Sequence, residues 1–318
     1  MPENRPSTGP FIAALAGNSL IAAAKFVAAA FTGSSVMIAE GVHSIVDSTN
    51  NVLMLVGARR SDAKPSPEHP FGHGKELYFW SLIVALVIFS AGGGISIYEG
   101  ITHVLHPSPV ENPLWNYGVL GVSFVADGTT LVIAYREFKP HKGKRSLWRA
   151  IRVSKDPTKF AVVLEDGAAT IGLFIAAIGL LATQLTGSGI YDGLASIAVG
   201  LLLCAIAFVL ALESKNLLLG EAAAPRVVAD LRETVCRDPD VEGVASLLTM
   251  HLGPYDLLLN VDVAFREDLT GNETVAAIQR IERAIQRSHP EVKRIFIEAG
   301  SLDRTQPGAP SPPQSPGS

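Results

Sequence analysis

The chain has 318 residues, of which 48% are hydrophobic, and its formal net charge is −4 at pH 7. This charge excludes the strongly basic surface that nucleic-acid binding requires. The two cysteines, Cys204 and Cys236, lie far apart in sequence, which indicates neither a disulfide framework nor a CxxC zinc site. The hydrophobic residues fall in blocks before about residue 220. We therefore expect a membrane region followed by a soluble domain.

The apolar blocks are each long enough to cross a membrane, since a helical span needs roughly 20 residues. In chain order, we expect six spans at about residues 11–31, 36–57, 77–100, 116–135, 160–183 and 191–212. The sequence before the first span, MPENRPSTGP, lacks the basic start of a cleaved signal peptide. We expect the first apolar helix to be retained for this reason.

Basic residues in the connections predict the orientation of these spans. Segments 59–75 and 136–159 are rich in Lys and Arg, whereas connections 32–35, 102–116 and 184–190 contain neither. Because basic connections stay on the cytoplasmic side, we expect both termini in the cytoplasm. The expected location is the inner cell membrane, with the basic loops serving orientation and contact with anionic lipid headgroups.

The pattern changes after residue 220, where the apolar blocks end. We expect an amphipathic helix at 225–235, strands at 244–251 and 257–265 around a turn, a helix at 272–288 and a last strand at 292–297. This order predicts a small α+β domain of about 75 residues. We place domain boundaries at 11–215 and 216–300, after an N-terminal segment 1–10, and expect the Pro- and Ser-rich tail 301–318 to be disordered.

A polar stripe interrupts the second span. Glu40, His43 and Asp47 recur at helical spacing, and Asn50 and Asn51 continue the run. Charged groups at bilayer depth are costly, so they are retained mainly where they face a protein interior or a water-filled path. His43 and Asp47 share one helix face, which is the spacing that two metal ligands need. A hydrogen-bonded pair between helices is the alternative, and the asparagines are expected to make such contacts.

Acids on three spans fall at comparable depth. Helical rise places Asp47, Asp127 and Asp166 roughly 10–18 Å into the bilayer, where they can converge on one cation. Glu165 precedes Asp166 and points about 100° away from it on a helix. We take Asp166 as a ligand and Glu165 as a second ligand or a proton-handling neighbour. Asp127 is open to two interpretations, a ligand or an acid that packs between helices.

Other residues in the spans have simpler interpretations. Lys25 is expected to counter one of the acids, and Glu40 lies either at the outer mouth or in a bond between helices. Asp192 opens the sixth span and is expected to cap that helix. The run Ala91 to Gly94 permits close helix packing, with a dimer surface or a hinge as the alternative.

Four segments of the chain resemble the cation diffusion facilitator family of divalent-metal exporters. They are AEGVHSIVDSTNN in the second span, the loop HPFGHGKELYFW, LEDGAA in the fifth span and YDGLASIAVGLLL in the sixth. The combination of HxxxD in span two with LED in span five resembles the branch that holds mitochondrial and bacterial zinc transporters. The resemblance implies a homodimer, a transport site between spans two and five, exchange of metal for protons, and a ferredoxin-like cytoplasmic domain.

The resemblance also implies roles by position. His43 and Asp47 match the ligand pair of span two, and Asp166 matches the downstream ligand of span five. The upstream ligand of span five falls at Val162, which cannot coordinate a metal, so Glu165 or Asp127 would have to fill that place.

The loop after span two carries a second resemblance. His69 and His73 match positions that bind a peripheral metal in some members, and Ser66 replaces the accompanying acid, with Glu68 nearby. Lys75 matches a basic residue that helps to hold the dimer. In the soluble domain, His251 and His289 do not reproduce the family's metal cluster.

The predicted protein is thus a membrane α-helical chain of six transmembrane helices, followed by a small cytoplasmic α+β ferredoxin-like domain. We expect a Zn(II)/proton antiporter that exports metal, is not an enzyme, and needs no cofactor beyond its cargo. Fe(II), Co(II) and Mn(II) are alternative cargoes. An intramembrane metallohydrolase is disfavoured because the chain lacks HExxH. A metal sensor or scaffold is the remaining alternative.

Overall fold

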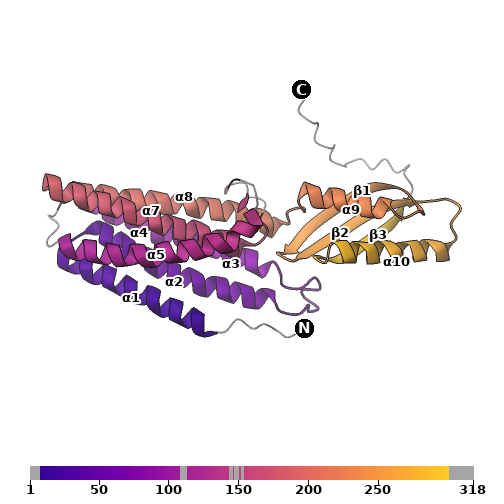
Figure 1. Cartoon of the computed structure of the whole chain (residues 1–318), viewed down its shortest axis with the longest axis horizontal. Coiled ribbons are helices and arrows are strands. Elements are labelled where there is room, and N and C mark those ends of the chain that lie inside the picture. Colours follow the sequence, from indigo (N-terminus) through magenta and orange to yellow (C-terminus); the bar gives the residue numbers. More distant parts are fainter. Residues whose placement is uncertain (1–7, 108–112, 143–145, 147–149, 152–153, 301–318) are drawn as a thin grey trace, which may run out of the picture. The chain divides into compact units, whose positions relative to one another are not determined.

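The chain forms two compact units, Met1–Leu219 and Gly220–Ser318, in a computed structural model (Figure 1). The structure describes residues 8–107, 113–142, 146, 150–151 and 154–300. The tail that we expect to be disordered begins at Ser301 and therefore lies outside the described residues. Most of the N-terminal segment 1–10 lies outside them as well.

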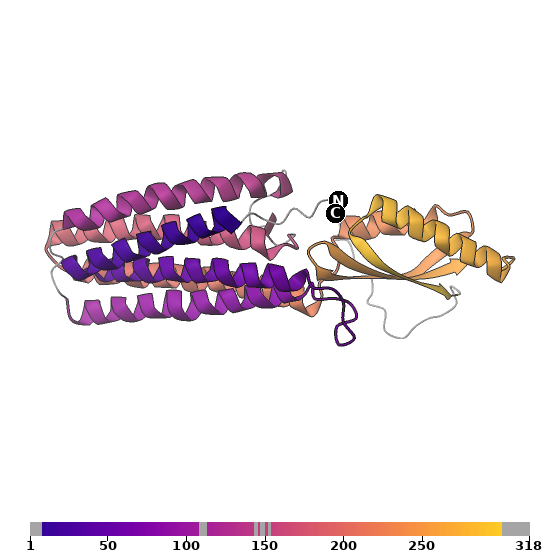
Figure 2. The ribbon, with the colours of Figure 1, turned by 90° about the horizontal axis from the view of Figure 1, so that it is seen from below.

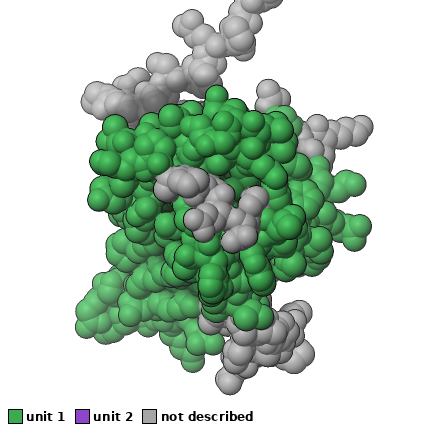
Figure 3. Space-filling model, turned by 90° about the vertical axis from the view of Figure 1, so that its left-hand side faces the viewer, with its two compact units in different colours: residues 1–219 green, residues 220–318 purple. Residues whose placement is uncertain are grey.

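The first unit is a bundle of long helices. Five of the predicted spans each lie within one helix, and the third, 77–100, runs through three continuous helical elements. The helices are α1 (Thr8–Thr32), α2 (Ser35–Ser61), α3 (Glu76–Val87), η1 (Ile88–Gly94), α4 (Ile95–Leu105), α5 (Pro113–Lys142), α7 (Pro157–Thr186) and α8 (Ile190–Leu219). The π-helical η1 joins α3 to α4 without a break, so these three elements make one span. Helix α1 packs against α2, α5 against α7 and α7 against α8, while the third span packs against α2 and α8 (Figures 1 and 2). Figure 3 shows the unit end-on.

Within the described residues, four helices are long and apolar enough to cross a membrane. They are Glu76–Leu105, Leu114–Lys139, Pro157–Thr186 and Ile190–Leu219. The described apolar part of α1 is shorter, Gly17–Thr32. Helix α2 has the length of a span, but its polar stripe and terminal arginines lower its apolar character. The predicted class, a helical membrane domain followed by an α+β domain, is confirmed.

Glycines allow the third span to approach α8 closely. A Cβ at Gly100 would lie 2.6 Å from the Gly193 carbonyl oxygen, and one at Gly200 would lie 2.9 Å from the Gly93 carbonyl oxygen. On each side of this contact, the two glycines are seven residues apart, which is about two helical turns. The glycine run at Ala91 to Gly94 therefore packs inside the same chain, as the simpler interpretation expected.

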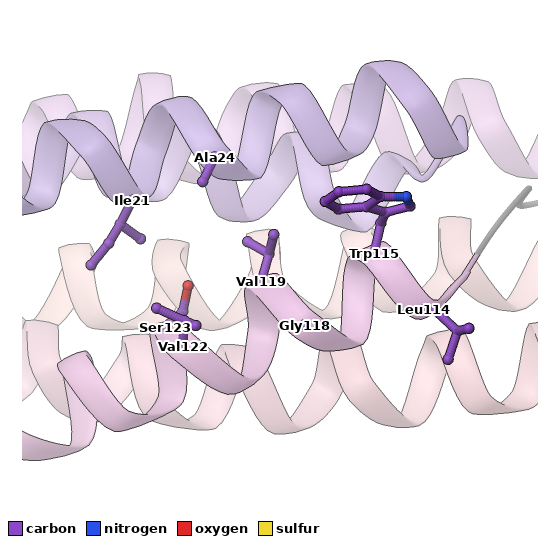
Figure 4. Close-up of a pocket in the computed structure, with 8 residues that line it drawn as sticks. All are labelled: Ile21, Ala24, Leu114, Trp115, Gly118, Val119, Val122 and Ser123. Atoms are coloured by element: carbon purple, nitrogen blue, oxygen red, sulfur yellow. The ribbon is translucent and has the colours of Figure 1, made fainter.

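An apolar pocket of about 420 Å³ lies between α1 and α5 (Figure 4). Its lining includes Ile21 and Ala24 of α1 and Trp115, Val119, Val122 and Ser123 of α5. None of the described residues that line it has a titratable side chain. An ion pathway needs charged or polar groups, so this pocket is not the place to seek the metal.

The second unit contains the predicted order of elements. Its elements are α9 (Pro225–Cys236), β1 (Val241–Gly253), β2 (Asp256–Phe265), α10 (Gly271–Ser288) and β3 (Val292–Gly300). The sheet order is β1-β2-β3, with β1 antiparallel and β3 parallel to the central β2. Alternate residues of β2 are buried against the helices, as Leu257, Leu259, Val261 and Val263 show. The helices lie together against the sheet (Figure 2).

Candidate metal centre

The candidate centre begins with two side chains of α2. His43 is 2% exposed, and its Nδ1 lies 3.5 Å from the Asp47 Oδ1 across one helical turn. The i, i+4 spacing places them on one face, as the sequence predicts. An imidazole binds a divalent metal when it is neutral, and a carboxylate binds one when it is ionised.

The start of α2 is fixed by an acid from another helix. The Asp192 carboxylate of α8 is fully buried and accepts hydrogen bonds from the Ser34 Oγ at 2.6 Å and the Val36 backbone N at 3.2 Å. It also accepts from the Ser35 hydroxyl at 2.8 Å. A carboxylate at a helix N-terminus is stabilised by the free N–H groups and the helix dipole.

This contact corrects the expected role of Asp192. The residue was expected to cap its own helix, α8, and instead it caps α2 and ties the two helices together. The serine pair at the start of α2 offers donors in the sequence, but nothing local identifies an acceptor 158 positions away.

Helices α5 and α7 bring three more acids toward α2. Asp47 interacts electrostatically with Asp127 of α5 and with Asp166 of α7. Asp127 and Asp166 also interact with each other. The structure therefore places acids from three helices close enough to interact electrostatically.

The two neighbouring acids of α7 face different partners. Glu165 is 9% exposed, interacts with Asp47, and lies beside Asn50 of α2. Asp166 is half-buried and lies beside Thr130 and Asp127 of α5. Glu165 thus neighbours α2, whereas Asp166 neighbours α5 and also interacts with Asp47 of α2. Sequence reasoning had ranked Asp166 first because helical spacing alone does not show which acid faces α2.

Several buried atoms of the centre lack a hydrogen-bond partner among the described residues. These atoms are both ring nitrogens of His43, the Asp47 Oδ1, the Glu165 Oε1 and the Asp166 Oδ2. Leaving a buried polar group unsatisfied costs about 1–3 kcal/mol, and more when the group is charged. A bound cation or a set of protons would relieve that cost.

The side chains do not form a closed coordination shell as they stand. In the described part of the chain, no three His, Cys, Asp or Glu side chains are close enough to hold one ion. Val162, at the position where the resemblance calls for a ligand, is an apolar side chain that is 39% exposed. Binding at this centre therefore requires the acids of α5 and α7 to approach His43 and Asp47.

The loop between α2 and α3 brings its two histidines together. The rings of His69 and His73 have centroids 4.5 Å apart, and the His69 backbone N donates to the Ser66 Oγ at 3.2 Å. Glu68 lies beside His69, and hydrogen bonds from the Glu68 backbone and from the Ser66 side chain lower the pKa of its carboxyl group. The carboxylate next to the histidine pair thus stays ionised at neutral pH.

The remaining predicted residues belong to other elements of the chain. Lys75 precedes the first residue of α3 and is half-buried. In the second unit, the His289 Nδ1 lies 3.2 Å from the Glu291 Oε1, and His251 is buried in β1. The described residues of this unit contain no group of three metal ligands.

Lys25 and Glu40 form an ion pair that the sequence left open. The Lys25 Nζ donates to the Glu40 Oε2 at 3.0 Å and to the Ser44 Oγ at 2.9 Å. The pair joins α1 to α2, so Glu40 makes the bond between helices that was one of its two interpretations.

Comparison with known proteins matches this chain to a family. The family described as the cation efflux transmembrane domain matches residues 11–219, and the one described as the cation efflux protein cytoplasmic domain matches residues 224–299. The human protein named proton-coupled zinc antiporter SLC30A9, mitochondrial, is 35% identical over 243 residues, covering 76% of this chain and 43% of the human protein. The chain thus spans less than half the length of that relative.

Two other relatives cover more of their own length. Metal tolerance protein C4 of Arabidopsis thaliana is 29% identical over 336 residues, which cover 91% of this chain and 73% of the relative. The manganese efflux system protein MneP of Bacillus subtilis is 26% identical over 286 residues, which cover 89% and 92% respectively.

Proposed function

Because this chain belongs to the cation efflux family, we propose that it exchanges Zn(II) for protons across a membrane and moves the metal out of the cytoplasm. The observation that carries the proposal is that His43, Asp47 and Glu165 each have a buried nitrogen or oxygen atom without a hydrogen-bond partner among the described residues. Nitrogen and oxygen ligands of this kind suit Zn(II). The human relative's name, a proton-coupled zinc antiporter, supports both the cargo and the counter-ion.

In this proposal His43 and Asp47 supply the first two ligands. Glu165 supplies a third from α7, because it interacts with Asp47 and lies beside Asn50 of α2. Asp166 completes the site from the α5 side, and Asp127 stabilises the bound charge from α5. Glu165 thereby takes the place that Val162 cannot fill.

Metal and protons compete for the same atoms. His43 binds metal only when its ring is neutral, and the carboxylates bind only when they are ionised. Protonation on one side of the membrane therefore releases the ion, and deprotonation on the other side rebuilds the site. Small rigid-body movements of α5 and α7 against α2 would close and open the coordination shell, in the manner of alternating access.

The proposal includes the surroundings of the site. The protein acts as a homodimer in the inner cell membrane with both termini in the cytoplasm, and the match of its second unit to the family's cytoplasmic domain supports the dimer. We assign Lys75 to the dimer contact. His69 and His73 form a weak peripheral metal site, which the approach of their rings supports.

Manganese is the second candidate cargo. The proposed ligand set has one nitrogen and several carboxylate oxygens, and such a set also suits harder ions. The Bacillus subtilis relative is named as a manganese efflux protein. Fe(II) and Co(II) fall between these two in ligand preference.

Metal flux in proteoliposomes tests the proposal. The purified full chain is reconstituted, a pH gradient is imposed, and Zn(II), Mn(II), Fe(II) and Co(II) are offered separately beside protein-free vesicles. We expect gradient-driven flux that is fastest for Zn(II). Fastest flux of Mn(II) would change the cargo and keep the transporter, whereas no flux of any ion by folded protein would favour a sensor or scaffold.

A further inference from the structure

Lys25 is a buried cation inside the apolar bundle. Its side chain is 0% exposed, as is that of Glu40, and among the described residues no other lysine or arginine is buried. The ammonium is held at 3.0 Å by the Glu40 Oε2 and at 2.9 Å by the Ser44 Oγ. Its position is therefore fixed by two bonds to α2.

This ammonium stands next to the candidate metal centre. Glu40, Ser44 and Asp47 lie on one face of α2, and Ser44 precedes Asp47 by a single helical turn, about 4.5 Å of rise. The Lys25 charge interacts with His43 and Asp47 of α2 and with Asp127 of α5. The ammonium acts on both helices that flank the centre without being a ligand itself.

The partner of Lys25 is itself held in place. The Glu40 Oε1 has no hydrogen-bond partner among the described residues and lies against α7, where a Cβ at Gly172 would stand only 2.8 Å from it. Glycine at this position gives the carboxylate room. Glu40 is thus confined between α1 and α7, so the ammonium cannot swing away from the centre while the pair is intact.

Stability alone does not account for a buried pair of this kind. Removing two charges from water costs several kcal/mol per ion, and apolar replacements of similar volume are often as stable or more stable. A fixed charge in a low-dielectric interior does, however, act strongly on neighbouring charges, because water does not screen it. The neighbours here are the acids and the histidine of the proposed site.

We propose that Lys25 sets the cation affinity of the centre formed by His43, Asp47 and Glu165, an inference that rests on the proposed function. Its tethered positive charge weakens the binding of a divalent cation so that the ion can be released. Glu40 limits this effect by neutralising part of the charge. Lys25 therefore acts on the bound ion through its charge, and it does not coordinate the ion.

The proposal makes opposite predictions for the two partners. Lys25→Met leaves an extra negative charge and tightens Zn(II) binding, whereas Glu40→Gln leaves an extra positive charge and weakens it. We expect each shift to exceed about 100-fold, the scale for a unit charge and a divalent ion about 10 Å apart at an effective dielectric constant of about 20. The double variant returns toward the wild-type affinity, and Lys25→Arg, which keeps the charge, stays near it.

The test is equilibrium Zn(II) binding by the full chain in detergent at pH 8, measured by competition with a zinc indicator. Lys64→Met is the matched control, since Lys64 is an exposed lysine in the loop after α2. Monodisperse elution and an unchanged melting temperature show that each variant is folded. Shifts of both single variants in the same direction, or no shift in either, would overturn the inference.

Two outcomes separate this inference from the proposed function. If vesicles show no metal flux but the variants bind Zn(II) with opposite shifts, transport fails and the role of Lys25 stands. If flux occurs and Asp47→Asn abolishes it while the Lys25 and Glu40 variants bind like the wild type, transport stands and the inference fails. Should Lys25→Met not fold, Glu40→Gln decides alone, and binding that is unchanged or tighter overturns the role.

Discussion

Two groups of polar side chains, one in each unit of the chain, differ in how they are paired. In the second unit, Arg280 bonds to both Asp238 and Asp240, and Arg294 bonds to Asp256. In the first unit, His43 and Asp47 keep ligand atoms that are buried and lack hydrogen-bond partners among the described residues. Paired charges near the surface hold a fold together, whereas unsatisfied buried groups have to be explained by something that binds there.

Energetics explains why the contrast is informative. A surface ion pair contributes about 0–1 kcal/mol to the free energy of unfolding, so each such pair adds little to the stability of the second unit. A buried group without a partner costs about 1–3 kcal/mol, and the first unit carries several of them. Retaining such groups is consistent with a centre whose partner is a mobile ion.

Replacing Asp47 gives the largest expected effect. Asp47→Asn removes a proposed ligand, and because even outer-shell partners of metals change affinity about 10–100-fold, we expect flux to fall at least about 100-fold. Zinc uptake into proteoliposomes measures the loss. Asp62→Asn is the matched control, because Asp62 is an exposed aspartate at the end of the same helix. Flux that survives in Asp47→Asn would contradict the site assignment.

Replacing Asp192 tests whether the first unit also contains satisfied buried acids. Asp192→Asn places an amide N–H against the backbone donors of Ser35 and Val36. Hydrogen bonds to charged groups contribute about 1.5–3 kcal/mol each, so we expect the free energy of unfolding to fall by about 3 kcal/mol. The melting temperature in detergent should fall. An unchanged melting temperature would show that α2 does not depend on this acid.

Glycine substitutions compare packed and open helix faces within the first unit. Gly200→Ala puts a Cβ 2.7 Å from the Ile97 Cγ1, and overpacking of this kind costs about 1–3 kcal/mol. Gly167→Ala is its control, since nothing lies within 4 Å of a Cβ there. We expect Gly200→Ala to melt earlier and Gly167→Ala to melt no earlier than the wild type. Equal behaviour of the two would contradict the close seam between α4 and α8.

The smallest effect belongs to the second unit. Arg280→Ala should cost less than about 1 kcal/mol, because the Arg280 side chain is 41% exposed to solvent. Its hydrogen bond lowers the pKa of Asp238 below the ordinary 3.8. The contribution is therefore present above about pH 4 and is lost as the pH falls through the lowered pKa. Hydrogen exchange in α9 and β1 measures it, with Arg287→Ala as control. A difference that grows at acid pH would contradict the pairing.

Much of the fold could be predicted because it depends on local patterns. Apolar blocks predict the helices of the first unit. In the second unit, apolar strand patterns and a helix with a capping residue predict the order of elements. The capping box of Thr270 and Glu273 opens α10 near the position that the sequence indicated. Helical spacing likewise placed His43 and Asp47 on one face.

Long-range pairings could not be predicted in the same way. Asp192 accepts a hydrogen bond at the start of α2, Lys25 pairs with Glu40, and Glu165 interacts with Asp47. Each depends on the rotation of one helix against another, which spacing within a single helix does not contain. The π-helical turn at Ile88–Gly94 shifts such rotations further along the third span.

The most direct test of the central claim follows zinc and protons in the same vesicles. Proteoliposomes that carry a lumenal zinc indicator and a lumenal pH indicator receive external Zn(II) with no imposed pH gradient. If the buried cluster exchanges metal for protons, zinc entry makes the lumen more alkaline, and both signals disappear in Asp47→Asn. Zinc entry without a pH change, or entry that persists in Asp47→Asn, would contradict the account.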